Sequence, residues 1–398
     1  MLLSKNVNKE EFKSIDLAIQ EIANSVSHKD KINGKTHLHY KYPAGFSPEF
    51  PSAVTRAFTK PGDIILDPFM GGGTSLIEAN NLGRHAIGID VNELAVFSAM
   101  LKTLKLNPIA VAELEVWLND FIHMDKRKLK DVPDTYKDYF RELPKNLSNT
   151  IYYLVDSVEN LRFFSSQIFA RGVVLRSAQL ILDNKKFDPT LTSFMEKLEN
   201  NFDLMLEQTL AHNQTIKHLK NIQTQIIHGN CTDEKVVRAA LENNNRIKAV
   251  VTSPPYPGVH VLYNRWQFRG RREISLPYFI IGSKQNLAPS FFTLGNRSTQ
   301  AGIDKYFASI KSVFSNIGNH LEKGTPVVQL VAFNDKKVQL ERFLQSMSEA
   351  GYTEVRAYNV STSSDGRIWR EVPHRRWYNS LGNSSHSSSE VALIHRKK

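Results

Sequence analysis

One segment, residues 61–95, restricts the fold more than any other part of the chain: PGDIILDPFMGGGTSLIEANNLGRHAIGIDVNELA. An apolar run at residues 64–66 ends in a glycine-rich turn, helical spacing follows from Thr74, and a second apolar run covers residues 85–89. Strand, turn, helix and strand in this order predict the start of a parallel sheet, because the crossover helix returns the chain beside the first strand. The segment therefore predicts an α/β fold.

The rest of the chain extends this sheet and interrupts it once. Between residues 102 and 220 the sequence consists of long segments with helical period and few glycines, which predict a helical insertion. Five further strands are predicted after it, at residues 224–230, 247–256, 325–333, 354–360 and 390–396. We therefore predict a seven-stranded Rossmann-like sheet with a helical insertion, divided as residues 1–102, 103–221 and 222–398.

Composition narrows the cellular setting and the class of partner. The 398 residues are 41% hydrophobic, which is enough for a sizeable core, and the formal net charge of +11 favours a polyanionic partner. A single cysteine, Cys231, excludes an internal disulfide framework and a multi-cysteine zinc site, and it fits a reducing compartment. No long apolar run indicates a signal peptide or a membrane span. We expect a cytoplasmic protein without a metal and without a membrane partner.

The glycine-rich turn predicts a ligand site at the end of the first strand. Open α/β sheets bind ligands at this place, beside a helix N-terminus. The register F-x-G-x-G-T lacks the dinucleotide pattern G-x-G-x-x-G, which suits a cofactor without a pyrophosphate. Asp67 is predicted to face a cationic group, and Asp90, 23 residues later, to accept bonds from ribose hydroxyls. An ordinary turn is the alternative. Asn230, after the third strand, would contact an adenine edge or else cap the next helix.

The corner Ser253-Pro254-Pro255-Tyr256 follows the predicted fourth strand. Consecutive prolines fix the backbone, so the Ser253 hydroxyl and the Pro254 carbonyl are held as two acceptors, and pre-oriented acceptors suit an amine that must become tetrahedral as it attacks. Tyr256 offers a flat face on which an extruded base can stack. The alternative is a proline-stiffened turn whose tyrosine packs in the core.

Together, the D-P-F-x-G-x-G-T turn and the T-S-P-P-Y corner resemble the S-adenosylmethionine-dependent DNA amino-methyltransferases, and within them the N4-cytosine type. The resemblance covers roughly residues 40–102 and 222–398. It implies S-adenosylmethionine as the cofactor and Ser253, Pro254, Pro255 and Tyr256 as the catalytic residues that hold the base. The cofactor-binding residues that it implies are Phe46, Ser47, Asp67, Pro68, Phe69, Gly71, Gly73, Thr74, Asp90 and Asn230.

The position of the insertion departs from that family. In that family the target-recognition region usually follows or splits the catalytic half, whereas the largest insertion in this chain lies between the second and third predicted strands. A recognition module, a scaffold and an oligomer contact all remain open for residues 103–221. The oligomeric state and the recognition sequence are not predicted.

Two segments combine arginines with aromatic residues and are candidate nucleic-acid surfaces. Arginine binds phosphates and guanine edges, and an aromatic side chain can fill the space of a flipped base. The alternative for each is a solvated basic hairpin with its aromatics in the core. The candidates are Arg265, Trp266, Arg269, Arg271 and Arg272 in residues 260–273, and Arg367, Arg370, Arg375 and Arg376 in residues 367–379.

These features predict a site-specific enzyme that transfers a methyl group from S-adenosylmethionine to N4 of a flipped cytosine in double-stranded DNA, as part of a restriction-modification system with a cognate endonuclease. Adenine N6 remains open as the target, because serine, aspartate and asparagine all supply acceptors at the first position of the corner. An RNA base and a catalytically inactive DNA-binding relative also remain open. A nicotinamide-dependent oxidoreductase is disfavoured by the missing third glycine.

Overall fold

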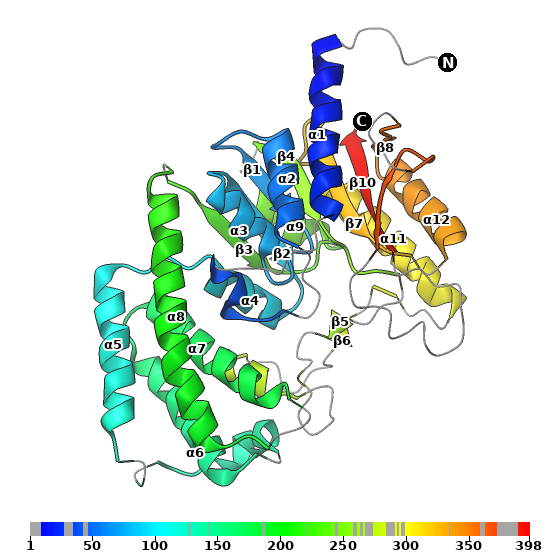
Figure 1. Cartoon of the computed structure of the whole chain (residues 1–398). Helices are drawn as coiled ribbons and strands as arrows, with labels where there is room; N and C mark the ends of the chain where they lie inside the picture. The colour runs from blue at the N-terminus through cyan, green and yellow to red at the C-terminus, as the bar shows by residue number, and fades with distance from the viewer. Residues whose placement is uncertain are drawn as a thin grey trace.

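A computed structural model describes residues 9–27, 35–42, 47–125, 127, 129–141, 143–184, 188–219, 221–242, 246–257, 261–262, 266, 274–283, 291–292, 294–295, 299–333, 335–358, 363–371 and 389–398. A twisted sheet with helices on both faces forms one part of the molecule, and a group of helices lies to one side of it (Figure 1). Among the described helices, none is long and apolar enough to cross a bilayer.

The sheet has the strand order β3-β2-β1-β4-β7-β10-β8, and β9 pairs with β10. β3, β2, β1, β4 and β7 run parallel, whereas β10 is antiparallel to each of its partners. The strands of this sheet are β1 (Ile64–Asp67), β2 (His85–Asp90), β3 (Thr224–His228), β4 (Ile247–Thr252), β7 (Pro326–Val331), β8 (Tyr352–Val355), β9 (Ile368–Glu371) and β10 (Ser389–Lys397). This arrangement confirms the predicted α/β sheet with its seven strands.

Three details of the strands differ from the prediction. β8 covers Tyr352–Val355, whereas a strand was predicted over residues 354–360. β4 ends at Thr252 rather than continuing to Tyr256, because prolines cannot donate to a strand ladder. The short strand β9 was not predicted, and it lies within residues 367–379, one of the two candidate nucleic-acid surfaces. A separate pair, β5 (Val261–Leu262) with β6 (Phe291–Phe292), lies outside the main sheet.

The central strands are buried on both faces, which explains their continuous apolar runs. In β1, Ile65 faces the core under helices α1 (Lys9–Ser27), α2 (Glu49–Phe58) and α3 (Thr74–Asn81). The next residue, Leu66, faces the opposite core with α9 (Glu234–Leu241), α11 (Gln300–Gly318) and α12 (Lys336–Glu349). Successive side chains point to opposite faces of a strand, so a run of this kind needs a helical layer on each side.

The helical module lies between β2 and β3 in the chain. It consists of α4 (Glu93–Lys102), α5 (Pro108–His123), η3 (Asp134–Phe140), α6 (Lys145–Ser157), η4 (Val158–Asn160), α7 (Phe164–Leu182) and α8 (Leu191–Lys217), packed around one apolar core. The core also includes Trp266 and residues of α10 (Leu276–Ile280), so the module packs against the C-terminal half of the chain. The short helix η1 (Lys35–His39) contacts α8 and α4.

Helix caps set where the main helices of this module begin. The Asn107 side chain accepts a hydrogen bond from the Ala110 amide at 2.8 Å at the start of α5, and Pro108 occupies the first helical turn. At the start of α8, Thr190 and Ser193 bond each other's backbone groups in a capping box. The interior of α7 is buried on most sides, between α4, α5, α6 and α8.

Candidate active site

Four of the predicted site residues lie at the carboxyl ends of neighbouring strands. Asp67 ends β1, Asp90 ends β2, Asn230 follows β3 and Ser253 follows β4. Because the order β3-β2-β1-β4 places these parallel strands side by side, the four residues share one edge of the sheet. Ligands bind outside the carboxyl ends of strands where the strand order reverses, and β1 is that place here, with β2 on one side and β4 on the other.

Asp67 is fully buried and bonded within the protein. Its Oδ1 accepts hydrogen bonds from the Phe69 amide at 3.1 Å and the Thr252 hydroxyl at 2.7 Å, and its Oδ2 accepts one from the Ser75 hydroxyl. Burial raises the pKa of the carboxyl to about 6, against the effect of these donors. Asp67 therefore ties the glycine turn, α3 and the end of β4 together.

The glycine turn is shaped by close packing. Gly71 and Gly73 have φ of 49° and 78°, which side chains rarely adopt. A Cβ at Gly72 would lie 2.8 Å from Cβ of Tyr42, and one at Gly73 would lie 2.9 Å from Cβ of Ala99. The glycines are thus required by the turn and by its protein neighbours. Pro68 and Thr74 are buried beside them, and Phe69 is half-buried.

Asp90 has capacity left for a ligand. Its Oδ2 accepts the Gly71 amide at 3.0 Å and its Oδ1 accepts the Asn92 amide at 3.0 Å. The Val91 amide also bonds this carboxyl, and because a carboxylate has about four lone-pair positions, acceptor capacity remains beyond the three amides. Burial raises the pKa of Asp90 to about 6, although the three amides favour the ionised form. Asp90 therefore fits hydroxyl donors better than the more enclosed Asp67 does.

Lys102, at the end of α4, lies behind the same turn. It is 3% exposed, and its Nζ donates a hydrogen bond to the Gly72 carbonyl at 3.1 Å. Burial, and to a lesser degree the nearby Arg176, lowers its pKa to about 7. Two side chains that were not predicted from the sequence, Lys102 and Tyr42, therefore pack against the turn at Gly72.

Asn230 is exposed in a turn after β3. Its Oδ1 accepts the Thr232 amide at 3.0 Å, and the next helix, α9, is capped by Asp233 rather than by Asn230. The adjacent Cys231 is buried and donates to the Pro68 carbonyl at 3.3 Å. Burial raises the pKa of this thiol. The turn is thereby attached to the glycine-rich turn of β1.

The SPPY corner is held at three points. The Ser253 hydroxyl donates to the Leu330 carbonyl of β7 at 2.9 Å, which commits its proton and leaves its oxygen as an acceptor. The Pro255 carbonyl accepts the hydroxyl of buried Tyr306 from α11 at 2.8 Å. Tyr256 donates to Glu390 of β10 at 2.5 Å. Pro254 is buried, whereas Ser253 and Tyr256 are half-buried. The corner is fixed before any ligand arrives.

Ser47, another predicted cofactor residue, lies near the start of α2. Ser47 donates its hydroxyl to the carboxylate of Glu49 in the first turn of that helix. Phe46 lies outside the described residues. A cofactor role for both stays a prediction.

Trp266 corrects the predicted nucleic-acid surface. It is 1% exposed and packs in the core of the helical module, so it is a structural residue rather than a base contact. The alternative prediction for residues 260–273 was a solvated basic hairpin with its aromatic side chains in the core. The neighbouring candidates Arg265, Arg269, Arg271 and Arg272, and the later pair Arg375 and Arg376, lie outside the described residues.

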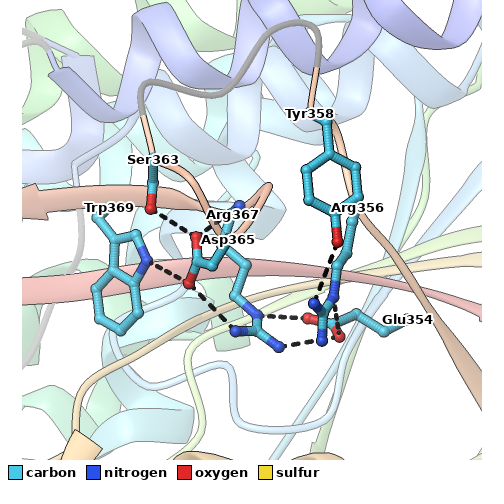
Figure 2. Close-up of polar contacts among 7 residues, drawn as sticks. All are labelled: Glu354, Arg356, Tyr358, Ser363, Asp365, Arg367 and Trp369. Atoms are coloured by element: carbon cyan, nitrogen blue, oxygen red, sulfur yellow. Dashed lines mark hydrogen bonds and ion pairs between the residues drawn. The ribbon is translucent and has the colours of Figure 1, made fainter.

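Arg367 and Arg370 are also bound within the protein. Figure 2 shows Arg367 between Glu354, at 2.6 Å, and Asp365, which in turn accepts the indole Nε1–H of Trp369 at 3.0 Å. The Arg367 side chain is 9% exposed, and that of Arg370, paired with Glu390, is 12% exposed. Neither arginine is placed to reach a phosphate in this arrangement, because both are enclosed by carboxylates.

Sequence reasoning missed further residues at this edge. Thr252 binds Asp67, and Asn92 donates to the Tyr278 hydroxyl at 2.9 Å, close to Asp90. Thr252 directly precedes the corner, which was a usable signal. Tyr278 comes from α10, more than 180 residues away in the chain, and a single sequence gives no signal for such a contact.

The fold is an α/β sheet with the predicted site residues at its carboxyl edge, and comparison with known proteins shows what the chain is similar to. Residues 5–101 match the family model described as DNA methylase. This family uses S-adenosylmethionine as its methyl donor. The match relates the chain to the N6/N4 DNA methylases and does not separate the two types.

Individual relatives agree with this relation. The chain is similar to the type II methyltransferase M.BsoBI of Geobacillus stearothermophilus, with 23% identity over 322 residues that cover 72% of this chain and 61% of that protein. It is also similar to M.MjaII of Methanocaldococcus jannaschii, with 30% identity over 111 residues, 27% of this chain and 20% of that protein. The chain thus spans less than two thirds of either relative.

Solved structures add little. The rRNA methyltransferase aviRa from Streptomyces viridochromogenes aligns with a TM-score of 0.36 and 8% identity over 94% of this chain and 92% of that chain. A score this low supports no argument about function, and the fold rests on the strand order described above.

Proposed function

We propose that this protein is an S-adenosylmethionine-dependent DNA methyltransferase that modifies N4 of a flipped-out cytosine. The observation that carries the proposal is the shared edge at which the acidic ends of β1 and β2 lie beside the SPPY corner of β4. Such a transfer requires a cofactor site beside an amine-binding corner, and the adjacency of the ends of β1, β2 and β4 supports this assignment. The match to the DNA methylase family over residues 5–101 supports the same class.

The donor set at this edge fits the proposed cofactor. Asp90 keeps acceptor capacity for a ribose hydroxyl beyond the three backbone amides that bond it, and the amide of half-buried Gly71 is one of these three. S-adenosylmethionine supplies a methyl group on a sulfonium when it is bound. Asp67, by contrast, acts through Ser75 and Thr252 and orders the turn. This assignment differs from the expectation that Asp67 itself faces a cationic group.

The corner supplies the acceptors for the target amine. The hydroxyl proton of Ser253 is committed to the Leu330 carbonyl, so Ser253 presents oxygen lone pairs to the amine hydrogens. The Pro254 carbonyl provides the second acceptor. Their fixed positions favour the tetrahedral form of the nitrogen as it attacks, since no rearrangement is needed at that moment. Tyr256 offers its ring to the extruded base.

Double-stranded DNA is the proposed substrate, and a cognate restriction endonuclease is the proposed partner. The type II methyltransferases to which the chain is similar support both, as does the net charge of +11. Cytosine is favoured by the T-S-P-P-Y form of the corner. Adenine N6 is the second candidate, since the family match includes both types.

Transfer of labelled methyl groups by the purified protein tests this function. Unmethylated plasmid DNA, the same DNA denatured, and total RNA are incubated with labelled S-adenosylmethionine. We expect incorporation into duplex DNA and none with the Asp90→Ala variant, which loses the ribose contact. Incorporation into RNA alone would show that RNA, rather than DNA, is the substrate. No incorporation into duplex DNA, denatured DNA or RNA would contradict the proposal.

A further inference from the structure

Tyr256 of the corner is anchored by a buried ion pair from a distant part of the chain. Its hydroxyl donates to Oε1 of Glu390 at 2.5 Å. The other oxygen of that carboxylate, Oε2, accepts from Nε of Arg370 at 2.7 Å and pairs with Nη2 at 2.6 Å. The side chains of Glu390 and Arg370 are 8% and 12% exposed. The three residues form one chain of charge-assisted hydrogen bonds, which are shorter and stronger than neutral ones.

Strand pairing fixes the position of this chain. Glu390 of β10 and Arg370 of β9 lie directly opposite each other in the antiparallel register. Opposite residues on one face of such a pair have closely spaced Cβ atoms, so the arginine is held against the carboxylate by the backbone itself. Both carboxylate oxygens are engaged, one by each neighbour, and the carboxylate therefore has one preferred orientation.

The anchor determines how the tyrosine ring is presented. A tyrosine side chain turns about two torsions, and a bond at its hydroxyl restrains both of them. The Tyr256 ring is half-buried, next to Ser253 and to Pro255, whose carbonyl is held by Tyr306. A base that stacks on the ring would meet it at a set tilt relative to the acceptors of the corner. Misplacement of reacting groups by about 1 Å can reduce rates about 100-fold.

We propose that Glu390, held by Arg370, is a positioning residue that fixes the tilt of the Tyr256 ring against the target base. This inference rests on the proposed function, because it requires a base stacked at the corner. Glu390 acts through Tyr256 and does not touch the cofactor edge. Loss of the anchor should therefore slow methyl transfer and leave cofactor affinity unchanged.

A double-mutant cycle tests the inference. Tyr256→Phe, Glu390→Gln and the double variant are compared with the intact protein in kcat and KM on unmethylated plasmid DNA, together with the Kd for S-adenosylhomocysteine. We expect each single variant to lose about 10-fold in kcat, and the double variant to lose no more than either single, because each eliminates the same charge-assisted bond. The Kd for S-adenosylhomocysteine stays within about twofold of the intact protein.

Glu354→Gln is the matched control. Glu354 and Arg367 form a second enclosed ion pair, with side chains 15% and 9% exposed, and Figure 2 shows bonded neighbours of both. Both glutamine variants are expected to lower Tm by similar amounts, whereas only Glu390→Gln lowers kcat. If kcat depended only on stability, it would fall equally in Glu390→Gln and Glu354→Gln.

The possible outcomes separate the inference from the proposed function. Active intact protein with unchanged kcat in Tyr256→Phe and Glu390→Gln would overturn the inference alone, as would losses that multiply in the double variant. No methyl transfer by the intact protein to DNA or RNA would overturn the proposed function, and the inference with it.

Discussion

The Thr252 hydroxyl donates a 2.7 Å hydrogen bond to the buried carboxyl of Asp67, and this contact joins the glycine turn to the strand that carries the SPPY corner. The two residues lie 185 positions apart in the chain. Asp67 also accepts from Ser75 of α3 and from the Phe69 amide. The relative position of the proposed cofactor and base sites is therefore set inside the protein core.

Thr252→Val should destabilise the protein in a pH-dependent manner. The substitution keeps the shape and removes one donor to a carboxyl whose pKa is about 6. Hydrogen bonds to charged groups contribute about 1.5–3 kcal/mol, so we expect the free energy of unfolding to fall by about 2 kcal/mol at pH 8. The loss should be smaller at pH 5, where Asp67 is mostly protonated. Urea unfolding at both pH values measures this loss, with Thr209→Val, at a buried threonine of α8, as the control. Equal losses at both pH values would contradict the role of the ionised carboxylate.

Ser253→Ala should separate catalysis from cofactor binding. The variant loses an acceptor at the reacting amine, and loss of one pre-oriented group of this kind lowers kcat by about 100-fold or more. The bond to the Leu330 carbonyl contributes only about 1 kcal/mol to stability, so folding should be preserved. Calorimetric titration with S-adenosylhomocysteine should give an unchanged Kd. Parallel loss of affinity and rate would instead assign the corner a structural role.

Cofactor affinity should fall as the pH is lowered through about 6. Asp67 and Asp90 both have a pKa raised to about 6 by burial, and hydroxyl donors favour the ionised form of Asp90. Binding then lowers the Asp90 pKa and releases protons, so affinity is full above pH 6 and decreases by up to about tenfold per pH unit below it. Titrations with S-adenosylhomocysteine from pH 5 to pH 8 check this. A Kd that is constant over that range would remove Asp90 from the site.

Lys102→Met should raise stability while weakening cofactor binding. The pKa of buried Lys102 is about 7 in the folded protein and near the ordinary lysine value of 10.5 in the unfolded chain, so the unfolded chain binds more protons between these pH values. The stability of the intact protein should therefore rise with pH from about 7 to about 10, and the methionine variant should lack this rise. Its gain in stability is expected to be largest at and below pH 7.

The same substitution removes the bond that holds the Gly72 carbonyl. We therefore expect a raised Kd for S-adenosylhomocysteine from Lys102→Met and no change from Lys105→Met, whose lysine is exposed and bonds the Ile222 carbonyl. If the free energy of unfolding depended on pH in the same way for the intact protein and for Lys102→Met, burial would not lower the pKa of Lys102.

Local patterns were sufficient to predict the sheet and its ligand edge. The apolar runs around Asp67 and Asp90 and the glycines between them specify strand, turn and helix from neighbouring residues alone. The contacts that complete the edge are of another kind. Thr252, Tyr278 and Glu390 reach it through strand order and helix packing, and the periodicity of a single sequence carries no information about such long-range pairs.

Burial also decided which charged and aromatic residues were misassigned. Trp266 was predicted as a base contact because arginines surround it in the sequence, yet it fills the core of the helical module. Arg370 was predicted to bind nucleic acid and instead pairs with Glu390. A basic composition cannot distinguish an arginine enclosed by a carboxylate from one that faces solvent, because both arrangements have the same sequence signature.

The measurement that tests the central claim most directly is mass spectrometry of nucleosides from the DNA of cells that express the protein, with the Ser253→Ala variant as the control. The account predicts N4-methylcytosine with the intact protein and none with the variant. N6-methyladenine in its place would retain the corner and change the base, whereas the absence of both modified nucleosides would contradict the assignment of this protein as a DNA methyltransferase.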